Sequence, residues 1–351
     1  MNQLEINSRF RTRPATGVER FAGEVISRLA PGADLKVTEH LPPSAIGGMR
    51  GHLWEQFQLP RAMTGNGVLF SPCNTGPLAV SQQLVVIHDA AVWDQPEGFS
   101  SSFRNLYRQL LPRLAKRCAA VATVSEFSRS RLAQFLGLPE ERIVTLGNAV
   151  SDAFTPLSDS KAEGMRFLTV GSLDPRKNTS TLIQAWIGLK KEGRLPDDAT
   201  LDIIGGANTT TFAAVDQVED PAIRWLGRVD DDELIEHYRN ATAFVFPSLY
   251  EGFGLPPLEA MACGCPVLLS NAASLPEVGG DAFDPAEPDS SGAAIYFDPH
   301  SQTAIENAIT GFLELGDDQR TRLASNAIAR SKLFSWDAVA NRTRDALCAI
   351  A

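Results

Sequence analysis

Short apolar runs that alternate with helical segments are the feature that most constrains the fold of this chain. In the first half, three runs are largely apolar and continuous rather than apolar at every second residue, at 84–87, 121–124 and 142–146. Strands buried on both faces of a parallel sheet have this continuous pattern. A helical segment with an apolar face precedes them, and Thr16 and Glu19 form a capping box at its start. We therefore expect a doubly wound α/β domain in this half.

The same alternation restarts after the polar segment 155–164, which we interpret as a linker. The strands expected in the second half occupy residues 166–170, 201–204, 223–226, 243–246, 267–269 and 294–297. Most of them end at glycine, proline or another turn residue, as strands do before a loop. A chain of 351 residues is long enough for two hydrophobic cores. The predicted architecture is α/β: two facing Rossmann-like doubly wound domains, 1–155 and 156–336, with a ligand cleft between them.

Charge and cysteine content exclude several classes of protein. The net charge is −10, and the second half carries the excess acid because the first 160 residues hold 16 basic and 14 acidic side chains. A chain this acidic is unsuited to general nucleic-acid binding, which needs a wide basic surface. Five scattered cysteines argue against a disulfide framework and for a reducing compartment. Because no segment has the length and apolarity of a membrane span or a signal peptide, we expect a cytoplasmic protein.

A loop that carries two cations follows the expected strand at 166–170. It runs from Gly171 through Ser172 to Arg176 and Lys177, immediately before an expected helix. Helix N-termini and basic side chains attract phosphate groups, although a solvated turn with two surface cations fits the residues about equally well. No G-x-x-x-x-G-K-[ST] or G-x-G-x-x-G motif follows any strand, which disfavours a P-loop NTPase and an ordinary dinucleotide dehydrogenase.

Two glutamates lie eight residues apart after the expected strand at 243–246. Glu251 lies in a loop next to glycine, and Glu259 lies early in a short helix that follows two prolines. A carboxylate accepts paired hydrogen bonds from vicinal hydroxyls, so the two glutamates can hold two different sugars of one ligand. The glycines permit close approach of the backbone to such a ligand. Helix capping by Glu259 and a surface position for Glu251 are the simpler alternative.

The segment 248–262, with Glu251 and Glu259, resembles the retaining glycosyltransferases of family four, which have the GT-B fold. The resemblance continues in family order along almost the whole chain, through Thr16-Gly17-Val18, His88-Asp89, residues 124–128, Gly147-Asn148-Ala149-Val150, Pro175-Arg176-Lys177-Asn178 and Phe334-Ser335-Trp336. It implies that the C-terminal helix, residues 337–351, crosses back onto the first domain.

The resemblance also implies a nucleotide-sugar donor held mainly by the second domain. Glu259 would bind the ribose hydroxyls, and Glu251 the hydroxyls of the transferred sugar. Arg176 and Lys177 would clamp the pyrophosphate and stabilise the departing phosphate, which itself takes the acceptor proton. His88 would lie beside the transferred sugar as a catalytic residue. The other donor-binding positions that the resemblance implies are Gly17, Ser125, Ser172, Gly252, Phe253, Gly254 and Leu255.

Ser172 departs from the family pattern, because the loop glycine is commonly followed by arginine. The departure puts the pyrophosphate clamp in doubt: Arg176 must replace the missing cation, or Lys177 must act with neutral donors.

We expect no metal and no cofactor. No D-x-D motif stands at a strand end, and Asp230, Asp231 and Asp232 predict the start of a helix. Cys263 and Cys265 have neither a second cysteine pair nor a nearby histidine to complete a zinc site.

Residues 103–118 carry five basic side chains and no acid. Apolar residues at helical spacing predict an amphipathic helix, and a core-packed helix with a solvated basic face fits it slightly better than a helix lying on an anionic membrane. In family four this region often approaches lipid-linked acceptors. The resemblance therefore adds peripheral contact with the inner face of a membrane as a hypothesis.

The expected function is retaining transfer of a hexose from a nucleotide-diphosphate sugar to a glycan or lipid-linked saccharide acceptor in cell-surface polysaccharide synthesis. The loop with Ser172 and Pro175–Asn178 is similar to those of bacterial polysaccharide mannosyltransferases, which makes mannose from GDP-mannose the first choice. The alternatives are a nucleotide-sugar epimerase of the same fold and a non-catalytic sugar-nucleotide-binding subunit.

Overall fold

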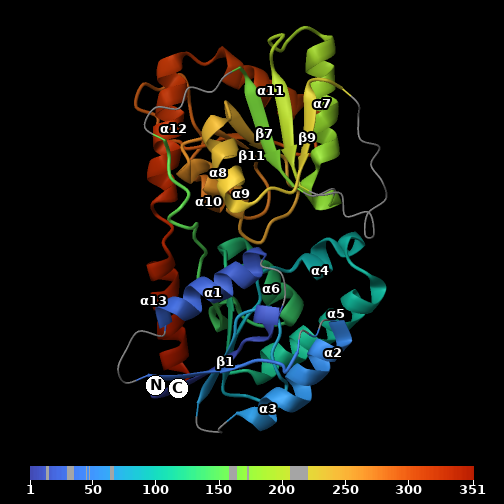
Figure 1. Cartoon of the computed structure of the whole chain (residues 1–351), viewed down its shortest axis with the longest axis vertical. Coiled ribbons are helices and arrows are strands. Elements are labelled where there is room, and N and C mark those ends of the chain that lie inside the picture. The colour runs from blue at the N-terminus through green and yellow to red at the C-terminus, as the bar shows by residue number, and fades with distance from the viewer. Residues whose placement is uncertain are drawn as a thin grey trace. The chain divides into compact units, whose positions relative to one another are not determined.

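The computed structural model describes residues 1–12, 16–29, 35–44, 46, 48–63, 67–157, 164–171, 174–205 and 220–351 (Figure 1). The chain divides into two compact units: unit 1 comprises Met1–Ala149 and Ser335–Ala351, and unit 2 comprises Val150–Phe334. The boundaries expected from the sequence lie slightly later, after residues 155 and 336. Residues 158–163 of the expected linker lie outside the described residues.

A six-stranded parallel sheet forms the centre of unit 1. Its strands are β1 (Gln3–Asn7), β2 (Lys36–His40), β3 (Val68–Ser71), β4 (Gln83–Val86), β5 (Ala120–Thr123) and β6 (Ile143–Thr145). Their spatial order is β2-β1-β3-β4-β5-β6, and Leu4 of β1 pairs with Val37 of β2 on one side and Val68 of β3 on the other. The strand order therefore reverses at β1, which makes the edge next to β1 and β3 a switch point of the sheet.

Helices pack against this sheet. They are α1 (Gly17–Leu29), α2 (Gly48–Leu53), α3 (Leu59–Ala62), α4 (Ala91–Asp94), α5 (Ser101–Arg117), α6 (Glu126–Leu136) and α13 (Trp336–Ala349), and a π-helical turn, η2 (Trp54–Gln58), joins α2 to α3. Helix α1 packs against α13, so the two ends of the chain meet in one unit (Figure 1). Thr16 closes the start of α1 with its backbone N–H and its hydroxyl, both of which donate to the carboxylate of Glu19.

Helix α5 corresponds to the basic segment expected at 103–118. Ser100 caps it by accepting a hydrogen bond from the backbone N–H of Phe103. Leu111, Leu114 and Ala115 are buried in a core cluster with side chains of β4, β5 and α6. The apolar side of α5 thus faces the core of unit 1, as the core-packed alternative predicts. Among the helices of the described residues, none has the length and apolarity needed to cross a bilayer.

Unit 2 is built around a second six-stranded parallel sheet. Its strands are β7 (Arg166–Val170), β8 (Thr200–Ile204), β9 (Ile223–Gly227), β10 (Ala243–Phe246), β11 (Val267–Ser270) and β12 (Ile295–Phe297). The spatial order is β12-β11-β10-β7-β8-β9, and Phe167 of β7 pairs with both Leu201 of β8 and Ala243 of β10. All nine strands that the sequence predicts in the two halves are present at or within one or two residues of their expected bounds.

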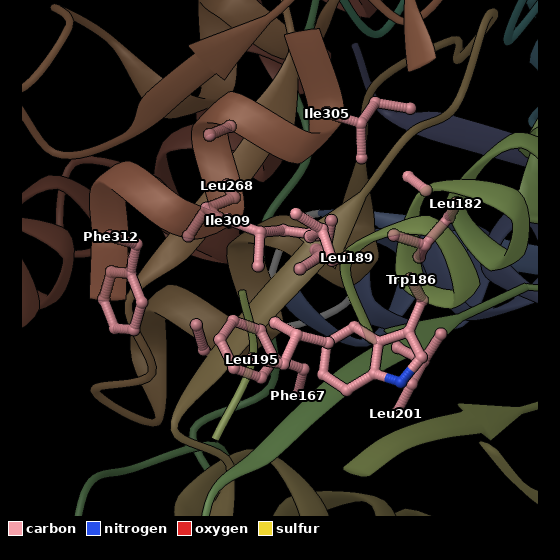
Figure 2. Close-up of a cluster of buried hydrophobic side chains, with 14 of the residues drawn as sticks. Phe167, Leu182, Trp186, Leu189, Leu195, Leu201, Leu268, Ile305, Ile309 and Phe312 are labelled. Carbon is pink, nitrogen blue, oxygen red and sulfur yellow. The ribbon is translucent and has the colours of Figure 1, made fainter. Parts of the chain in front are cut away.

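The helices of unit 2 are α7 (Thr179–Lys191), α8 (Asp231–Asn240), α9 (Leu255–Ala262), α10 (Leu275–Gly279), α11 (Gln302–Glu314) and α12 (Asp317–Ser331). Helices α7 and α11 bury their apolar side chains in one core cluster with the sheet. Figure 2 shows this cluster, in which Trp186 of α7 and Phe312 of α11 lie on either side of Phe167 from β7. Burying such aromatic side chains stabilises the fold by roughly 1.5–3 kcal/mol each.

The sequence patterns missed three strands of unit 1, β1 to β3. A charged residue hides β1, because Glu5 in its centre is fully buried and its carboxylate is hydrogen-bonded to Nε2 of His40 at the end of β2. β2 is largely polar, and β3 is an apolar run of only four residues. Pattern rules assign charged positions to the surface, and they fail where a buried charge has a partner on a neighbouring strand.

Candidate active site

The candidate site lies at the switch point of the unit 2 sheet. β7 lies between β8 and β10. The chain continues from β7 to β8 and β9 on one side of the sheet and then crosses to β10, β11 and β12 on the other side. The loop after β7, of which residues 171 and 174–178 are described, and the loop after β10, residues 247–254, meet at the carboxyl ends of these strands, since the Leu249 backbone N–H donates to the carbonyl of Arg176. Doubly wound sheets bind ligands at this position.

Lys177 and Glu251 form an ion pair between the two loops. Lys177 Nζ lies 2.7 Å from Glu251 Oε1, and the Ser248 hydroxyl lies 2.7 Å from the same oxygen. The ammonium also lies 5.3 Å from the centre of the Phe246 ring. Within the described part of the chain, nothing hydrogen-bonds to the other oxygen, Oε2. With side chains 22% and 14% exposed, the pair is accessible to a ligand.

Local geometry forces Lys177 into this position. A Cβ at Gly171 would lie 3.1 Å from the Cβ of Lys177, so glycine at the end of β7 leaves room for the close approach of Lys177. Pro175–Lys177 form a 3-10 turn, and Asn178 adopts φ = 54° to start α7. The Asn178 side-chain amide donates to the carbonyl of Pro299 at 2.8 Å, which anchors the loop. The asparagine of the P-R-K-N motif therefore has a structural function.

Arg176 forms a fork with Asp174 rather than pointing alone into solvent. Its Nε and Nη2 lie 3.0 Å and 2.6 Å from Asp174 Oδ2. Burial alone would raise the pKa of Asp174, but the hydrogen bonds and charge of Arg176 outweigh it and hold this pKa below its ordinary value. Arg176 and Lys177, the two basic side chains predicted to bind phosphate, are thus both paired with carboxylates in this structure.

The loop that carries Glu251 has a fixed backbone. Ser274 Oγ lies 3.0 Å from the carbonyl oxygen of Glu251 and 2.8 Å from that of Phe253. Gly254 adopts φ = 109°, and a Cβ there would lie 2.8 Å from Leu275. Helix α9 starts at Leu255 without a side-chain cap among the described residues, so its first N–H points out of the helix N-terminus. This geometry can place the backbone from Gly252 to Leu255 against an anionic or hydroxylated ligand.

Glu259 lies in α9 and is 8% exposed. The helix begins at Leu255, before the two prolines rather than after them as expected. Glu259 Oε2 accepts a hydrogen bond of 3.1 Å from the phenol of Tyr238, a fully buried residue of α8. Burial and the negative charge of Glu259 raise the pKa of Tyr238 well above its ordinary value, so the phenol is a permanent donor.

His88 belongs to unit 1 and follows β4. Its Nε2 lies 2.8 Å from the carbonyl oxygen of Pro72, and its backbone N–H donates to Asn74 Oδ1 at 2.8 Å. Burial lowers the pKa of His88, so the ring is neutral at pH 7. Because a carbonyl only accepts, the proton of the neutral ring lies on Nε2 and leaves Nδ1 as an acceptor. Asp89 does not orient this ring through a hydrogen bond; its carboxylate accepts from the N–H of Ala91.

The remaining predicted positions are placed as follows. Ser125 is buried and caps α6, accepting from the backbone N–H of Ser128 at 3.0 Å. Gly17 is exposed and is the first residue of α1. Ser172 lies outside the described residues. Gly17, His88 and Ser125 belong to unit 1, whereas Arg176, Lys177, Glu251 and Glu259 belong to unit 2.

Sequence reasoning missed four side chains that hold these groups: Asp174, Ser248, Ser274 and Tyr238. Asp174 had a local signal, because it precedes Arg176 by two residues. Tyr238 had one as well, since Ile235 and Tyr238 are the buried residues of an otherwise charged helix. Ser248 and Ser274 act across loops, and no local pattern identifies them.

Acidic and sulfur-containing side chains of the described residues form no cluster that could hold a metal ion. Asp230 accepts from the N–H of Glu233, whose side chain reaches back to the N–H of Asp230, so the three aspartates start helix α8 as predicted. Burial raises the pKa of Cys263 to about 12, which keeps that thiol protonated and unreactive.

Comparisons with known proteins agree on one family. The family model "Glycosyl transferases group 1" matches residues 157–330. O-antigen chain mannosyltransferase B of Escherichia coli is 32% identical over 77% of this chain and 71% of its own length. The serotype-specific mannosyltransferase WbdA of Escherichia coli is 31% identical over 67% of this chain, a match that spans 29% of WbdA.

Solved structures share the fold. Sucrose-phosphate synthase from Thermosynechococcus elongatus has a TM-score of 0.75 at 18% identity and covers 99% of this chain and 98% of its own. WaaG, a glycosyltransferase of lipopolysaccharide biosynthesis, has a TM-score of 0.68 at 15% identity and covers 98% of this chain and 99% of its own. The expected GT-B type of fold, with two Rossmann-like parts, is confirmed.

Proposed function

This chain belongs to the group 1 glycosyl transferases and is a glycosyltransferase, and we propose that it transfers mannose from GDP-mannose to a saccharide acceptor. The named relatives are mannosyltransferases of O-antigen chains, which supports a mannosyl donor and a role in cell-surface polysaccharide synthesis. The proposed acceptor is a glycan or a lipid-linked saccharide, and the proposed stereochemistry is retention at the anomeric carbon.

The observation that carries the proposal is the Lys177–Glu251 pair at the switch point of unit 2. A diphosphate bound there would be a second anionic partner for Lys177, besides Glu251. Among the described residues, no group donates a hydrogen bond to Glu251 Oε2. We propose that Lys177 turns to the diphosphate while Glu251 accepts hydrogen bonds from the sugar hydroxyls. An ion pair that is partly exposed costs little to exchange, because water and ligand replace its partners.

In the proposed reaction, the acceptor oxygen attacks the anomeric carbon on the face that the phosphate leaves. The bond between that carbon and the phosphate oxygen breaks, and its electron pair stays on the phosphate. The acceptor proton passes to the same phosphate oxygen, so no protein base is required. Lys177, with Arg176 beside it, stabilises the negative charge that develops on the phosphate. A single donor of this kind raises kcat about 10²–10³-fold.

His88 is proposed to accept a hydrogen bond from the transferred sugar. Neutral imidazole with its proton on Nε2 leaves Nδ1 for a sugar hydroxyl. We propose that the transfer needs no metal, since Lys177 and Arg176 provide the charge that a divalent cation provides in other enzymes. Chelation with EDTA is then expected to leave the transfer rate unchanged.

Peripheral membrane contact is also part of the proposal, together with a cytoplasmic location in which the five free cysteines stay reduced. The buried apolar side of α5 moves the proposed contact away from residues 103–118. Met49, Leu53 and Phe57 form an apolar stripe on α2 and η2, and each is at least 50% exposed. Arg50 and Arg61 flank this stripe, which suits anionic lipid headgroups.

Donor binding and transfer test the proposed function. We expect GDP to raise the melting temperature more than UDP, since a ligand at 100 times its Kd stabilises a protein by about 2.7 kcal/mol. Incubation with GDP-mannose and a mannose-terminated acceptor is expected to give an α-linked product by NMR. Epimerised donor without acceptor product would indicate the epimerase, and GDP binding without turnover would indicate a binding subunit.

A further inference from the structure

The hydrogen bond between Tyr238 and Glu259 joins two helices of unit 2. Tyr238 lies in α8 and Glu259 in α9, and the phenol donates to Oε2 at 3.1 Å. Tyr238 has no solvent exposure, and its ring packs edge-on against Phe244 of β10, 5.5 Å between centres, and near Phe154 at 6.2 Å. The position of the phenol is therefore set by the core rather than by solvent.

A buried phenol next to a carboxylate affects how that carboxylate binds. A carboxylate of glutamate rotates about its last bond unless a donor holds one oxygen, and each such bond to a charged group is strong. Tyr238 occupies one acceptor position of Oε2, which fixes the plane of the carboxylate within α9. The orientation of the Glu259 carboxylate is thereby restrained by a donor whose own position the core sets.

We propose that Tyr238 is a positioning residue that orients Glu259 for a pair of vicinal hydroxyls and so makes the site selective for ribonucleotides over 2′-deoxyribonucleotides. The inference rests on the proposed function, in which Glu259 binds the ribose of the donor. Recognition of two hydroxyls at once needs a fixed carboxylate, whereas one hydroxyl tolerates a rotating one. Tyr238 acts through Glu259 and does not touch the donor itself.

The test compares GDP and 2′-deoxy-GDP by isothermal titration calorimetry on the full chain. We expect wild-type protein to bind GDP about tenfold or more tightly than 2′-deoxy-GDP, because a hydrogen bond from the 2′-hydroxyl to a carboxylate is lost. Tyr238→Phe is expected to lower GDP affinity about fivefold or more while leaving 2′-deoxy-GDP affinity nearly unchanged. The ratio of the two affinities therefore shrinks.

Tyr296→Phe is the matched control. The Tyr296 phenol also donates a hydrogen bond in unit 2, to the carbonyl of Gly280 at 2.8 Å, but it has no carboxylate partner in that bond. We expect this variant to keep the wild-type ratio, even where it loses stability. If the role of Tyr238 were merely structural, Tyr238→Phe would weaken the binding of GDP and of 2′-deoxy-GDP equally.

The outcomes separate this inference from the proposed function. An unchanged ratio in a folded Tyr238→Phe variant, with wild-type protein discriminating normally, overturns the positioning role alone. Wild-type protein that binds no nucleotide overturns the proposed function. If Tyr238→Phe does not fold, Glu259→Leu and Tyr238→Phe/Glu259→Leu provide the test by urea unfolding. Leucine removes the acceptor and leaves the buried phenol unpaired, so a phenol that serves only Glu259 makes the double variant at least as stable as the Glu259→Leu variant, and a less stable double variant contradicts the positioning role.

Discussion

Each sheet has a cation after its first strand that pairs with a carboxylate from another segment, and the two pairs differ in burial. In unit 1, Arg9 follows β1 and pairs with Glu55 of η2, with 3.6 Å between Nε and Oε1 and side chains 5% and 1% exposed. In unit 2, Lys177 follows β7 and pairs with Glu251 at 2.7 Å, and these side chains are 22% and 14% exposed. Both pairs lie where the strand order reverses.

Neutral partners hold the buried pair in place. Glu55 Oε1 accepts from Asn7 at 2.7 Å and from the Thr75 hydroxyl at 3.1 Å, and Arg9 donates to the same hydroxyl at 2.9 Å. Burial alone would raise the pKa of Glu55, but His52, Arg9 and these hydrogen bonds hold it below its ordinary value. The comparison teaches that position in a doubly wound sheet does not by itself make a ligand site. Accessibility decides whether a charge pair stabilises the fold or exchanges for a ligand.

Glu55→Ala is expected to have the largest effect, and on stability. Removing one partner of a buried ion pair leaves an uncompensated charge and costs about 3–5 kcal/mol. Urea unfolding measures this loss, and GDP affinity of the folded fraction is expected to stay at the wild-type value. A variant as stable as wild type would show that the pair in unit 1 is not a structural element.

Lys177→Ala is expected to have the opposite profile. Loss of the cation at the leaving phosphate lowers kcat about 10²–10³-fold, while stability changes by about 1 kcal/mol or less because the pair is partly exposed. Lys190→Ala is the control, since among the described residues Lys190 donates only to the backbone carbonyl of Asp197 on the surface. A Lys177→Ala variant that keeps wild-type kcat would show that Lys177 does not stabilise the leaving phosphate.

The residues of the candidate site in unit 2 could be named from the sequence because they lie in short local motifs of the chain. The spacing of Glu251 and Glu259 and the run Arg176-Lys177 are visible without a structure, and the resemblance to family four is confirmed. The pairing of Lys177 with Glu251 could not be predicted, because it joins residues 74 positions apart through two loops. Arg9 and Glu55 were missed because charged residues in unremarkable segments become a buried pair only when β1 and η2 meet.

His88 gives the smallest expected effect, on the pH dependence of stability. Its pKa in the folded protein lies below the unfolded value of about 6.5, so the unfolded state binds the proton first. Neutral His88 makes its full contribution to the free energy of unfolding above about pH 6.5. As the pH falls, this contribution is lost by at most about 1.4 kcal/mol per pH unit. Melting temperatures between pH 7.5 and 5 measure it, and His88→Gln is expected to flatten the curve. An identical slope in that variant would show that His88 is not buried as a neutral ring.

The exchange of partners by Lys177 is the central claim, and a crystal structure with GDP tests it most directly. We predict the diphosphate at the carboxyl ends of β7 and β10, with Lys177 Nζ hydrogen-bonded to a phosphate oxygen and no longer to Glu251. The buried pair of Arg9 and Glu55 is predicted to be unchanged in the same crystal. GDP bound elsewhere, or Lys177 still paired with Glu251 beside a bound diphosphate, would contradict the account.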